Sequence, residues 1–224
     1  MSPSSSLILQ DRAAAGRRLV EPLLQYARRS DVIVLALPRG GVPVAYEVAM
    51  ALEVRLDLML VRKLGAPSNE EFALGAIASG GIQILNDYAL RAHPIDQATF
   101  DGVVARETRE LLRREQAYRG TRAPVPLKDQ VVILIDDGLA TGASMMAAIQ
   151  AVRLQAPSRI VVAVPVAPIE TVEALRSEVD ELICPVVPDW FMSLGHWYMD
   201  FSQTSDAEVI KLLQRAWQRE AGNE

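Results

Sequence analysis

Hydrophobic residues gather in continuous runs along this chain rather than in alternating patterns. Runs of Val, Ile and Leu without polar alternation are typical of strands that are covered on both faces. Stretches with helical spacing separate the runs, and this alternation predicts an α/β fold with a parallel sheet, whose ligands bind at the carboxyl ends of the strands. The expected strands are Asp31–Leu37, Arg55–Val61, Gln130–Ile135, Arg159–Pro165 and Glu181–Val187, and the expected helices are Val42–Leu52, Ser144–Leu154 and Ile169–Ser177.

Two segments interrupt this alternation. Arg62–Gly81 has Gly, Pro, Ser and Asn near its start and is predicted to form a loop. Asn86–Gly120 predicts a helical insertion, because opposite charges recur in it at a spacing of four residues. Its expected inward-facing residues are Val103, Val104, Leu111 and Leu112. A charged outer helix is the favoured interpretation, and a subunit contact, as in a homodimer, is the alternative. Residues 1–224 are expected to form a single domain.

Composition and charge narrow the classes of function. The net charge is −5 and half of the residues are hydrophobic, as in an ordinary globular protein. No broad basic surface is implied, so we expect no nucleic-acid partner. The single cysteine excludes an intrachain disulfide and fits a reducing compartment, so a cytoplasmic location is expected. No apolar stretch is long enough to cross a bilayer, and no signal-peptide pattern is present.

The most informative segment is Val131–Ser144, in which an apolar strand ends in two carboxylates and a small-residue loop leads into a helix. Gly138 and Gly142 allow a tight turn, and the free N–H groups at a helix start bind phosphate. The adjacent acids, Asp136 and Asp137, repel a phosphate and instead suit nearby hydroxyl groups such as those of a ribose. A Mg²⁺ site and a solvated turn remain alternatives, whereas P-loop and dinucleotide fingerprints are absent.

This segment resembles the signature with which type I phosphoribosyltransferases bind 5-phosphoribosyl 1-pyrophosphate (PRPP). Ile133–Ser144 matches it nearly throughout, with Ala140 where a hydroxyl residue is more frequent. The chain looks most similar to bacterial phosphoribosyltransferases with a helical insertion, which implies a Rossmann-like parallel-sheet core and a small C-terminal hood. The resemblance assigns PRPP binding to Asp136, Asp137, Gly138, Leu139, Ala140, Thr141, Gly142, Ala143 and Ser144.

The family also has a pyrophosphate-binding loop after its first strand, often with an unusual cis peptide. Here Arg39, Gly40 and Gly41 occupy that place, where a guanidinium and backbone N–H groups can meet a polyanion. A third family element is a flexible loop that closes over the site, and 62–81 stands in its position. The resemblance assigns Lys63 to the pyrophosphate and Arg62 to a site carboxylate, with solvated surface charges as the alternative.

The fourth family element is the hood that holds the acceptor, here about 187–202. Five aromatic residues lie between Trp190 and Phe201, and flat rings suit stacking on a base. The segment resembles the tail of hypoxanthine-guanine phosphoribosyltransferases, which implies acceptor binding by Trp190, Phe191 and Trp197 and a metal-proximal role for Asp200. No lysine lies in 159–187 to recognise a 6-oxo group, so the acceptor stays unidentified, and a packed lid remains the alternative.

The resemblance implies a Mg²⁺-dependent transfer of a phosphoribosyl group from PRPP to a nitrogenous acceptor, such as a heterocyclic base, with release of pyrophosphate. Arg39 and Lys63 would stabilise the leaving group, and Asp137 would receive the acceptor proton. Two other interpretations remain open. A PRPP-sensing regulator would retain the fold without turnover. A phosphosugar hydrolase is disfavoured because no nucleophile motif is present.

Overall fold

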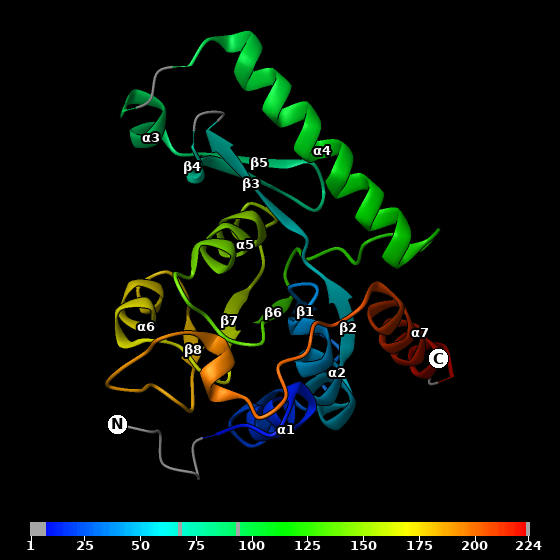
Figure 1. The fold of residues 1–224 in the computed structure, drawn as a ribbon. Coiled ribbons are helices and arrows are strands. Elements are labelled where there is room, and N and C mark those ends of the chain that lie inside the picture. The colour runs from blue at the N-terminus through cyan, green and yellow to red at the C-terminus, as the bar shows by residue number, and fades with distance from the viewer. Residues whose placement is uncertain (1–7, 67–68, 93–94, 223–224) are drawn as a thin grey trace.

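The core of the protein is a five-stranded parallel sheet with the strand order β2-β1-β6-β7-β8 (Figure 1). This computed structural model describes residues 8–66, 69–92 and 95–222. The strands are β1 (Val32–Ala36), β2 (Arg55–Leu58), β6 (Val131–Ile135), β7 (Arg159–Ala163) and β8 (Glu181–Ile183). The predicted parallel α/β fold is therefore confirmed, with strands shorter at their ends than the hydrophobic runs.

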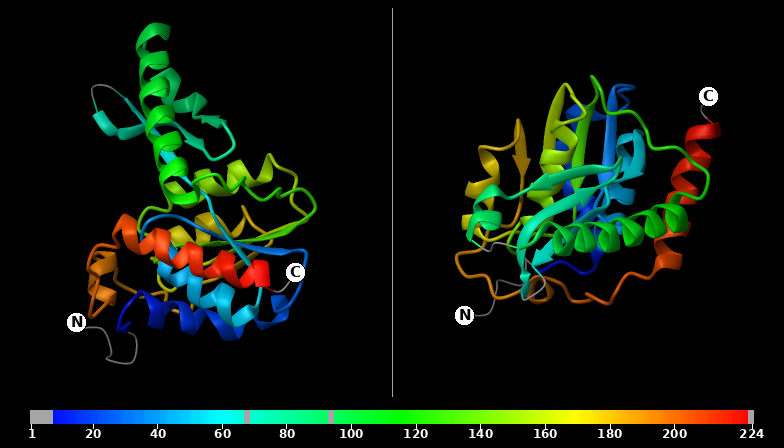
Figure 2. Two further views of the ribbon diagram at one scale, coloured as in Figure 1. Left: turned by 90° about the vertical axis from the view of Figure 1, so that its right-hand side faces the viewer. Right: turned by 90° about the horizontal axis from the view of Figure 1, so that it is seen from above.

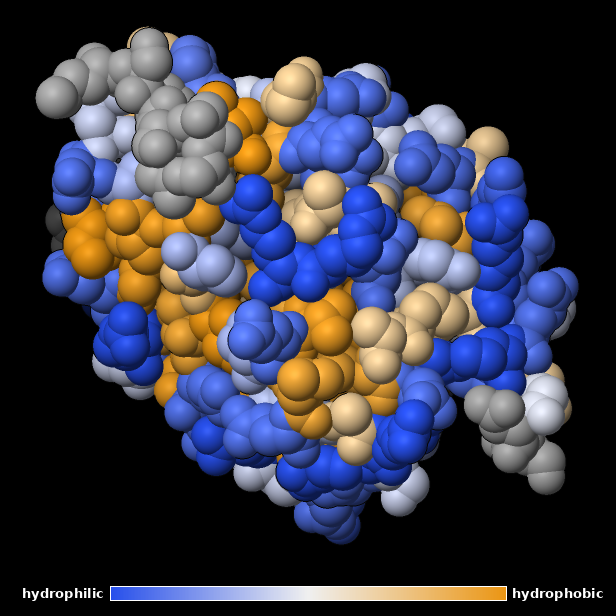
Figure 3. All heavy atoms as spheres, turned by 90° about the horizontal axis from the view of Figure 1, so that it is seen from below, coloured by the Kyte–Doolittle hydropathy of each residue, from blue (hydrophilic) through white to orange (hydrophobic). Residues whose placement is uncertain are grey.

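Helices cover both faces of this sheet, which explains its continuous hydrophobic strands. Val32 and Val34 pack on one side of β1, and Ile33 and Leu35 pack on the other. The first side is covered by α1 (Arg12–Val20), α2 (Gly41–Leu52) and α7 (Asp206–Gly222), and the second by α5 (Ala143–Arg153) and α6 (Ile169–Arg176). The outer side of the α1 layer exposes hydrophobic residues between hydrophilic ones (Figure 3).

A second unit, formed by the described residues 61–66, 69–92 and 95–119, projects from the core beyond α5 (Figure 2). It contains a three-stranded antiparallel sheet in the order β3-β4-β5 and two helices. The bounds are β3 (Val61–Ala66), β4 (Asn69–Ala78), β5 (Ile82–Leu85), α3 (Asp87–Ala92) and α4 (Gln97–Arg119). No described helix is both long and apolar enough to span a membrane.

The predicted loop at 62–81 is thus wrong, because β3 and β4 pair through most of that segment. The strands form because both of their faces are covered. Ala78 packs with the hydrophobic residues of α5, whereas Leu64 and Ile77 belong to the same cluster as Val103 of α4. This burial stabilises a pairing that the polar residues near the start of the segment do not indicate.

Helix α4 confirms the expected helix in the insertion and corrects one of its inward positions. Val103 and Leu111 are buried, but the side chain of Leu112 points outward and is 55% exposed. At its end the helix is fixed to the core by a buried ion pair, in which Arg119 Nε lies 2.9 Å from Asp57 Oδ1. Arg119 Nη2 also donates to the carbonyl of Leu58 at 2.6 Å. The insertion is therefore anchored beside the carboxyl end of β2.

Candidate functional site

The loop between β6 and α5 is held by the neighbouring β7–α6 connection. The Leu139 N–H donates to the Val166 carbonyl at 2.9 Å, and Thr171 Oγ1 donates to the Ala140 carbonyl at 2.6 Å. The backbone of this loop is therefore fixed from behind. Its outer residues, Ala140, Thr141, Ala143 and Ser144, are exposed to solvent. The helix start is thus accessible to an anion, as the phosphate assignment requires.

The two glycines of this loop adopt conformations that other residues avoid. Gly138 has φ +142° and Gly142 has φ +71°. A Cβ atom at Gly138 would lie 2.4 Å from Leu194 Cδ2, and one at Gly142 would lie 2.7 Å from Thr171 Cγ2. The tight turn expected from the sequence is present. A side chain at either position would meet neighbouring protein atoms, so the glycines permit close packing of the loop against the hood and α6.

The loop after β1 packs directly against the two acids that follow β6. A Cβ atom at Gly40 would lie 2.0 Å from Asp137 Oδ2, and one at Gly41 would lie 2.9 Å from Asp136 Cα. The peptide bond between Pro38 and Arg39 is cis. The Gly41 N–H already donates to the Leu37 carbonyl at 3.1 Å. The two loops predicted from separate motifs are therefore in contact at the carboxyl ends of adjacent strands.

The two acids have different environments. Asp137 is buried, and its Oδ2 atom lies 2.7 Å from Arg12 Nε. Asp136 is half-buried, and its Oδ1 atom accepts a hydrogen bond from the Asp137 N–H at 2.9 Å. Burial, followed by the charge of Asp137, raises the pKa of Asp136 well above its usual value. Asp137 is therefore held in an ion pair, while Asp136 binds a proton more readily than an ordinary aspartate.

Arg12 is a member of the site that the sequence analysis missed. Besides Asp137, its guanidinium contacts the hood: Nη1 donates to the Ser202 carbonyl at 2.6 Å, and Cζ lies 4.1 Å from the Phe201 ring centroid. The side chain is well buried, being 12% exposed. Arg12 thus joins α1, the acid pair and the hood. No local pattern indicates this role, because Arg12 is separated from Asp137 by 125 residues.

Arg39 faces an acid of α7. Its Nη1 atom lies 3.6 Å from Asp206 Oδ1, and both side chains are at least one-third exposed. The same carboxylate accepts a hydrogen bond from Tyr118 Oη at 2.7 Å. Burial and this hydrogen bond raise the pKa of Tyr118 to about 12. An exposed ion pair of this length is weak, so a polyanion at the loop can displace Asp206.

Arg62, the first of the two expected cations of the closing segment, contacts an acid of the insertion. Arg62 binds Glu107 of α4, with Nη2 lying 2.6 Å from Oε2. Its expected pairing with a carboxylate of the site stays a prediction. Burial opposes ionisation of Glu107, but hydrogen bonds from Arg106 and Arg62 hold its pKa below the usual value. Arg62 pairs with Glu107 because α4 packs along β3 and places this acid beside the guanidinium.

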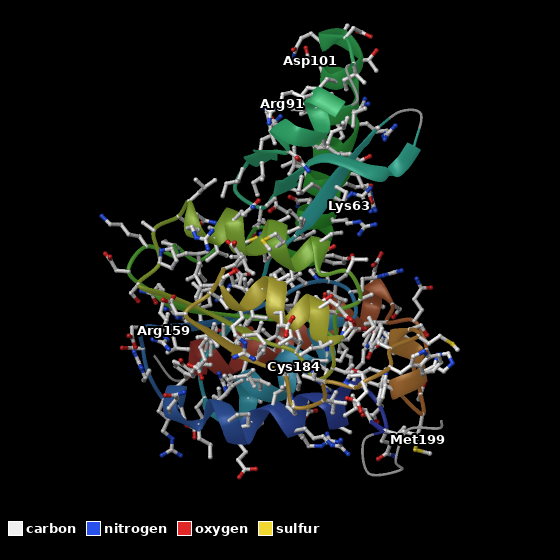
Figure 4. The ribbon with its side chains drawn as sticks, turned by 90° about the vertical axis from the view of Figure 1, so that its left-hand side faces the viewer. Lys63, Arg91, Asp101, Arg159, Cys184 and Met199 are labelled. Carbon is white, nitrogen blue, oxygen red and sulfur yellow. The ribbon has the colours of Figure 1, made fainter. Side chains whose placement is uncertain are left out.

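Lys63 lies on β3, between the tip of the insertion and the core (Figure 4). Its side chain is exposed. A cleft of about 330 Å³ is lined by both Lys63 and Ser144, the last residue of the motif. The insertion therefore brings Lys63 to the same cleft as the start of α5, despite its position on a strand rather than in a loop.

The hood separates the three predicted acceptor-binding aromatics. Trp190 is 62% exposed, and Phe191 is half-buried against the core. Trp197 is 5% exposed, and its indole nitrogen has no hydrogen-bond partner among the described residues. The prediction that Trp197 offers a ring to the acceptor is therefore wrong, since its ring belongs to the hydrophobic core.

Two further residues of the hood, Tyr198 and Asp200, differ in burial. The Tyr198 hydroxyl donates to the backbone carbonyl of Asp137, and burial, followed by the charge of Asp137, raises the pKa of Tyr198. Asp200 is exposed, and its Oδ1 atom accepts a hydrogen bond from the Ser202 N–H at 2.9 Å. Among the described residues, no group of three or more His, Cys, Asp or Glu side chains could hold a metal ion. Asp200 is therefore not part of a cluster of protein ligands.

Comparison with known proteins agrees with this geometry. The chain matches the phosphoribosyl transferase domain family over residues 5–201. It is 42% identical over 209 residues to a Mycobacterium tuberculosis H37Rv protein named "Putative phosphoribosyl transferase Rv0571c". That alignment covers 93% of this chain and 47% of the relative, so the chain spans about half the length of the curated relatives it matches.

Solved structures extend the comparison. The protein TT1426 from Thermus thermophilus is 44% identical, with a TM-score of 0.82 over 93% of this chain and 98% of that one. AQ2163 from Aquifex aeolicus is 13% identical, with a TM-score of 0.51 over 82% and 78% of the two chains, and it supports the fold alone. With the family match covering nearly the whole chain, we conclude that this protein belongs to the phosphoribosyl transferase family.

Proposed function

We propose that the protein transfers a phosphoribosyl group from PRPP to a nitrogenous heterocyclic acceptor and releases pyrophosphate. The observation that carries this proposal is the contact between the two loops, in which Gly40 packs against Asp137. That contact brings a guanidinium-bearing loop beside an acid pair and a helix start, at the carboxyl ends of β1 and β6. PRPP presents pyrophosphate, ribose hydroxyls and a 5′-phosphate in a matching order.

In this proposal each part of PRPP meets one part of the site. The 5′-phosphate binds the exposed backbone and hydroxyls of 140–144 at the start of α5. The ribose hydroxyls donate to Asp136 and Asp137. The pyrophosphate lies against the loop after β1, where its charge replaces Asp206 as the partner of Arg39. Lys63 reaches the leaving group across the cleft that it shares with Ser144.

The structure-based proposal revises which acid takes the acceptor proton. Asp137 is engaged by Arg12 at 2.7 Å, so its charge is already stabilised by a partner. Asp136 has a raised pKa, so once it is ionised it takes up a proton more readily than an ordinary aspartate. We therefore assign the proton to Asp136, while Asp137 and Arg12 orient the ribose. This assignment replaces the expectation that Asp137 is the acceptor of the proton.

Mg²⁺ fits the proposal as an ion held mainly by the substrate. Mg²⁺ prefers oxygen ligands and retains several waters. The described residues offer separate carboxylates rather than a cage of protein ligands, so PRPP oxygens would supply most of the coordination. Among the protein groups, Asp136, Asp137 and Asp200 could contact the ion or its waters. When bound, Mg²⁺ would neutralise the charge that develops on the departing pyrophosphate.

For the acceptor, Trp190 and Phe191 remain the proposed stacking residues. Trp190 is exposed, and Phe191 lies at the edge of the core. Stacking of one base on one ring contributes about 1–3 kcal/mol, which is sufficient to orient a small heterocycle. Transfer in a reducing cytoplasm is consistent with the single, half-buried cysteine.

The test is pyrophosphate release by the full chain, supplied with PRPP, MgCl₂ and one purine, pyrimidine or other heterocycle at a time. We expect release to depend on one acceptor class and to be lost in Asp136→Asn/Asp137→Asn. Arg153→Gln, which removes an exposed ion pair with Glu178 at the far end of α5, serves as the control and should remain active. Saturable PRPP binding without release with any acceptor would instead favour a PRPP-sensing regulator.

A further inference from the structure

A second cleft lies at the amino ends of the strands, opposite the carboxyl ends that carry the two loops. It has a volume of about 690 Å³ and is formed by the segments that precede β1, β2 and β6, together with the end of α7. Helix α7 extends from the candidate active site to this cleft. Asp206 at one end of α7 contacts Arg39, and Glu220 near the other end lines the cleft. At ~1.5 Å per residue the two positions are about 20 Å apart, and the ends of α7 are visibly distant (Figure 2).

The lining of this cleft has an excess of positive charge. Five arginines and two glutamates line it, namely Arg28, Arg29, Arg55, Arg122, Arg219, Glu53 and Glu220. Three of the arginines are neutralised by acids: the ion pairs join Arg28 to Glu53, Arg29 to Asp31 and Arg122 to Glu220. In a chain whose net charge is −5, such a local excess of cations points to an anionic ligand.

The other two arginines have no carboxylate within ion-pair distance among the described residues. Arg55 donates through Nη2 to the carbonyl of Ser30 at 3.1 Å and to the side-chain oxygen of Gln130. Arg219 donates to backbone carbonyls, including that of Val54 at 2.6 Å. Both side chains are half-buried, and the hydrogen bonds that hold them are to neutral oxygens, while the charge of Arg55 also acts on nearby Asp31. A bound anion would supply a counter-charge in direct contact with both guanidinium groups.

The remaining wall of the cleft is apolar. Val54 and the segment 123–126, which contains two prolines and a valine, line it. Arg122 lies above the indole ring of Trp217, with Cζ 4.8 Å from the ring centroid. Guanidinium groups beside an apolar wall match a ligand that joins phosphates to a flat heterocycle. A volume of several hundred cubic ångströms is typical of small-molecule sites.

We propose that this cleft binds a nucleotide, with its phosphates at Arg55 and Arg219 and its base against 123–126. The site is separate from the PRPP loops and does not rest on the proposed transferase reaction. Because the ligand lies about 20 Å from Arg39, it does not take part in the chemistry of PRPP. A nucleotide bound here is therefore an effector or a structural ligand rather than a substrate.

The test uses ATP as the probe and Trp217 as a local reporter. The chain has three tryptophans, so Trp190→Phe/Trp197→Phe leaves Trp217 as the single emitter. We expect ATP to change its emission saturably, with a Kd below about 1 mM, the weak end of specific binding. Calorimetric titration of the unsubstituted chain gives the same Kd without relying on a tryptophan variant.

Two arginine variants and a matched control locate the ATP. Arg55→Gln and Arg219→Gln should each raise the Kd for ATP at least tenfold. Arg17→Gln should not change it, because Arg17 forms an exposed pair with Glu47 outside the cleft. Saturating PRPP with Mg²⁺ should also leave the Kd unchanged. Absence of saturable binding, displacement of ATP by PRPP, or equal Kd values for all three arginine variants would each overturn the proposal.

Discussion

The contact between the two loops predicts a specific effect of adding one methyl group, in Gly40→Ala. The new Cβ atom would lie 2.0 Å from Asp137 Oδ2, about one ångström closer than real Cβ contacts allow. The carboxylate cannot simply rotate away, because Arg12 holds the same oxygen at 2.7 Å. Either the loop after β1 must move, or the ion pair between Arg12 and Asp137 must break.

Gly40→Ala should lower both the stability of the protein and its catalytic rate. Overpacking of this kind costs about 1–3 kcal/mol of folding free energy, which in a domain of this size lowers Tm by about 2–10 °C. Displacement of the loop by about one ångström also misplaces the groups that meet PRPP, and such misplacement lowers catalysis by on the order of 10²-fold. We therefore expect a large loss of kcat/KM for PRPP together with a moderate loss of stability.

The assay combines pyrophosphate release with thermal unfolding, and Gly102→Ala is the matched control. Gly102 lies in α4, and a Cβ atom there would meet nothing within 4 Å. That substitution should retain full activity and increase stability by about 0.5–1 kcal/mol, since alanine favours a helix. If Gly40→Ala binds PRPP with unchanged affinity and turns over normally, the two loops do not form one site.

Three further predictions concern the insertion, the hood and the cysteine. Lys63→Ala should lower kcat about 10- to 1000-fold with little change in PRPP affinity. The control Arg91→Ala, at the far end of the insertion (Figure 4), should leave kcat unchanged. Equal losses in kcat and affinity for Lys63→Ala would contradict a contact made in the transition state. Trp190→Ala should raise the KM for the acceptor about 5- to 150-fold without changing Tm. Trp197→Ala should instead lower the free energy of unfolding by about 3–5 kcal/mol. The opposite pattern would make Trp197 the acceptor-binding residue and Trp190 the structural one. Burial raises the pKa of Cys184 to about 11, so little of its thiol is ionised at pH 8. Alkylation by iodoacetamide should therefore be at least tenfold slower in the native protein than in urea. Equal rates would show that the thiol is accessible.

Local sequence was sufficient to predict the core sheet and the location of the two loops. Strands covered on both faces leave a local signature, since every side chain from Val131 to Ile135 is buried. The motif that follows is also local, because a turn, an anion-binding helix start and two acids all require particular neighbours in the chain. That each of these residues contacts PRPP stays a prediction, which the loss of release in the acid variants can test.

The contacts that surround the two loops depend on packing between segments that are distant in the sequence. Strands β3 and β4 form because α5 and α4 cover their two faces, so the polar residues of this segment misled a prediction based on local pattern. Arg12 and Tyr198 reach Asp137 across 125 and 61 residues. The burial of Trp197 and the pairing of Arg62 with Glu107 likewise depend on which elements pack together. Contacts of this kind have no local signature, because their free energy arises only when distant segments are folded against each other.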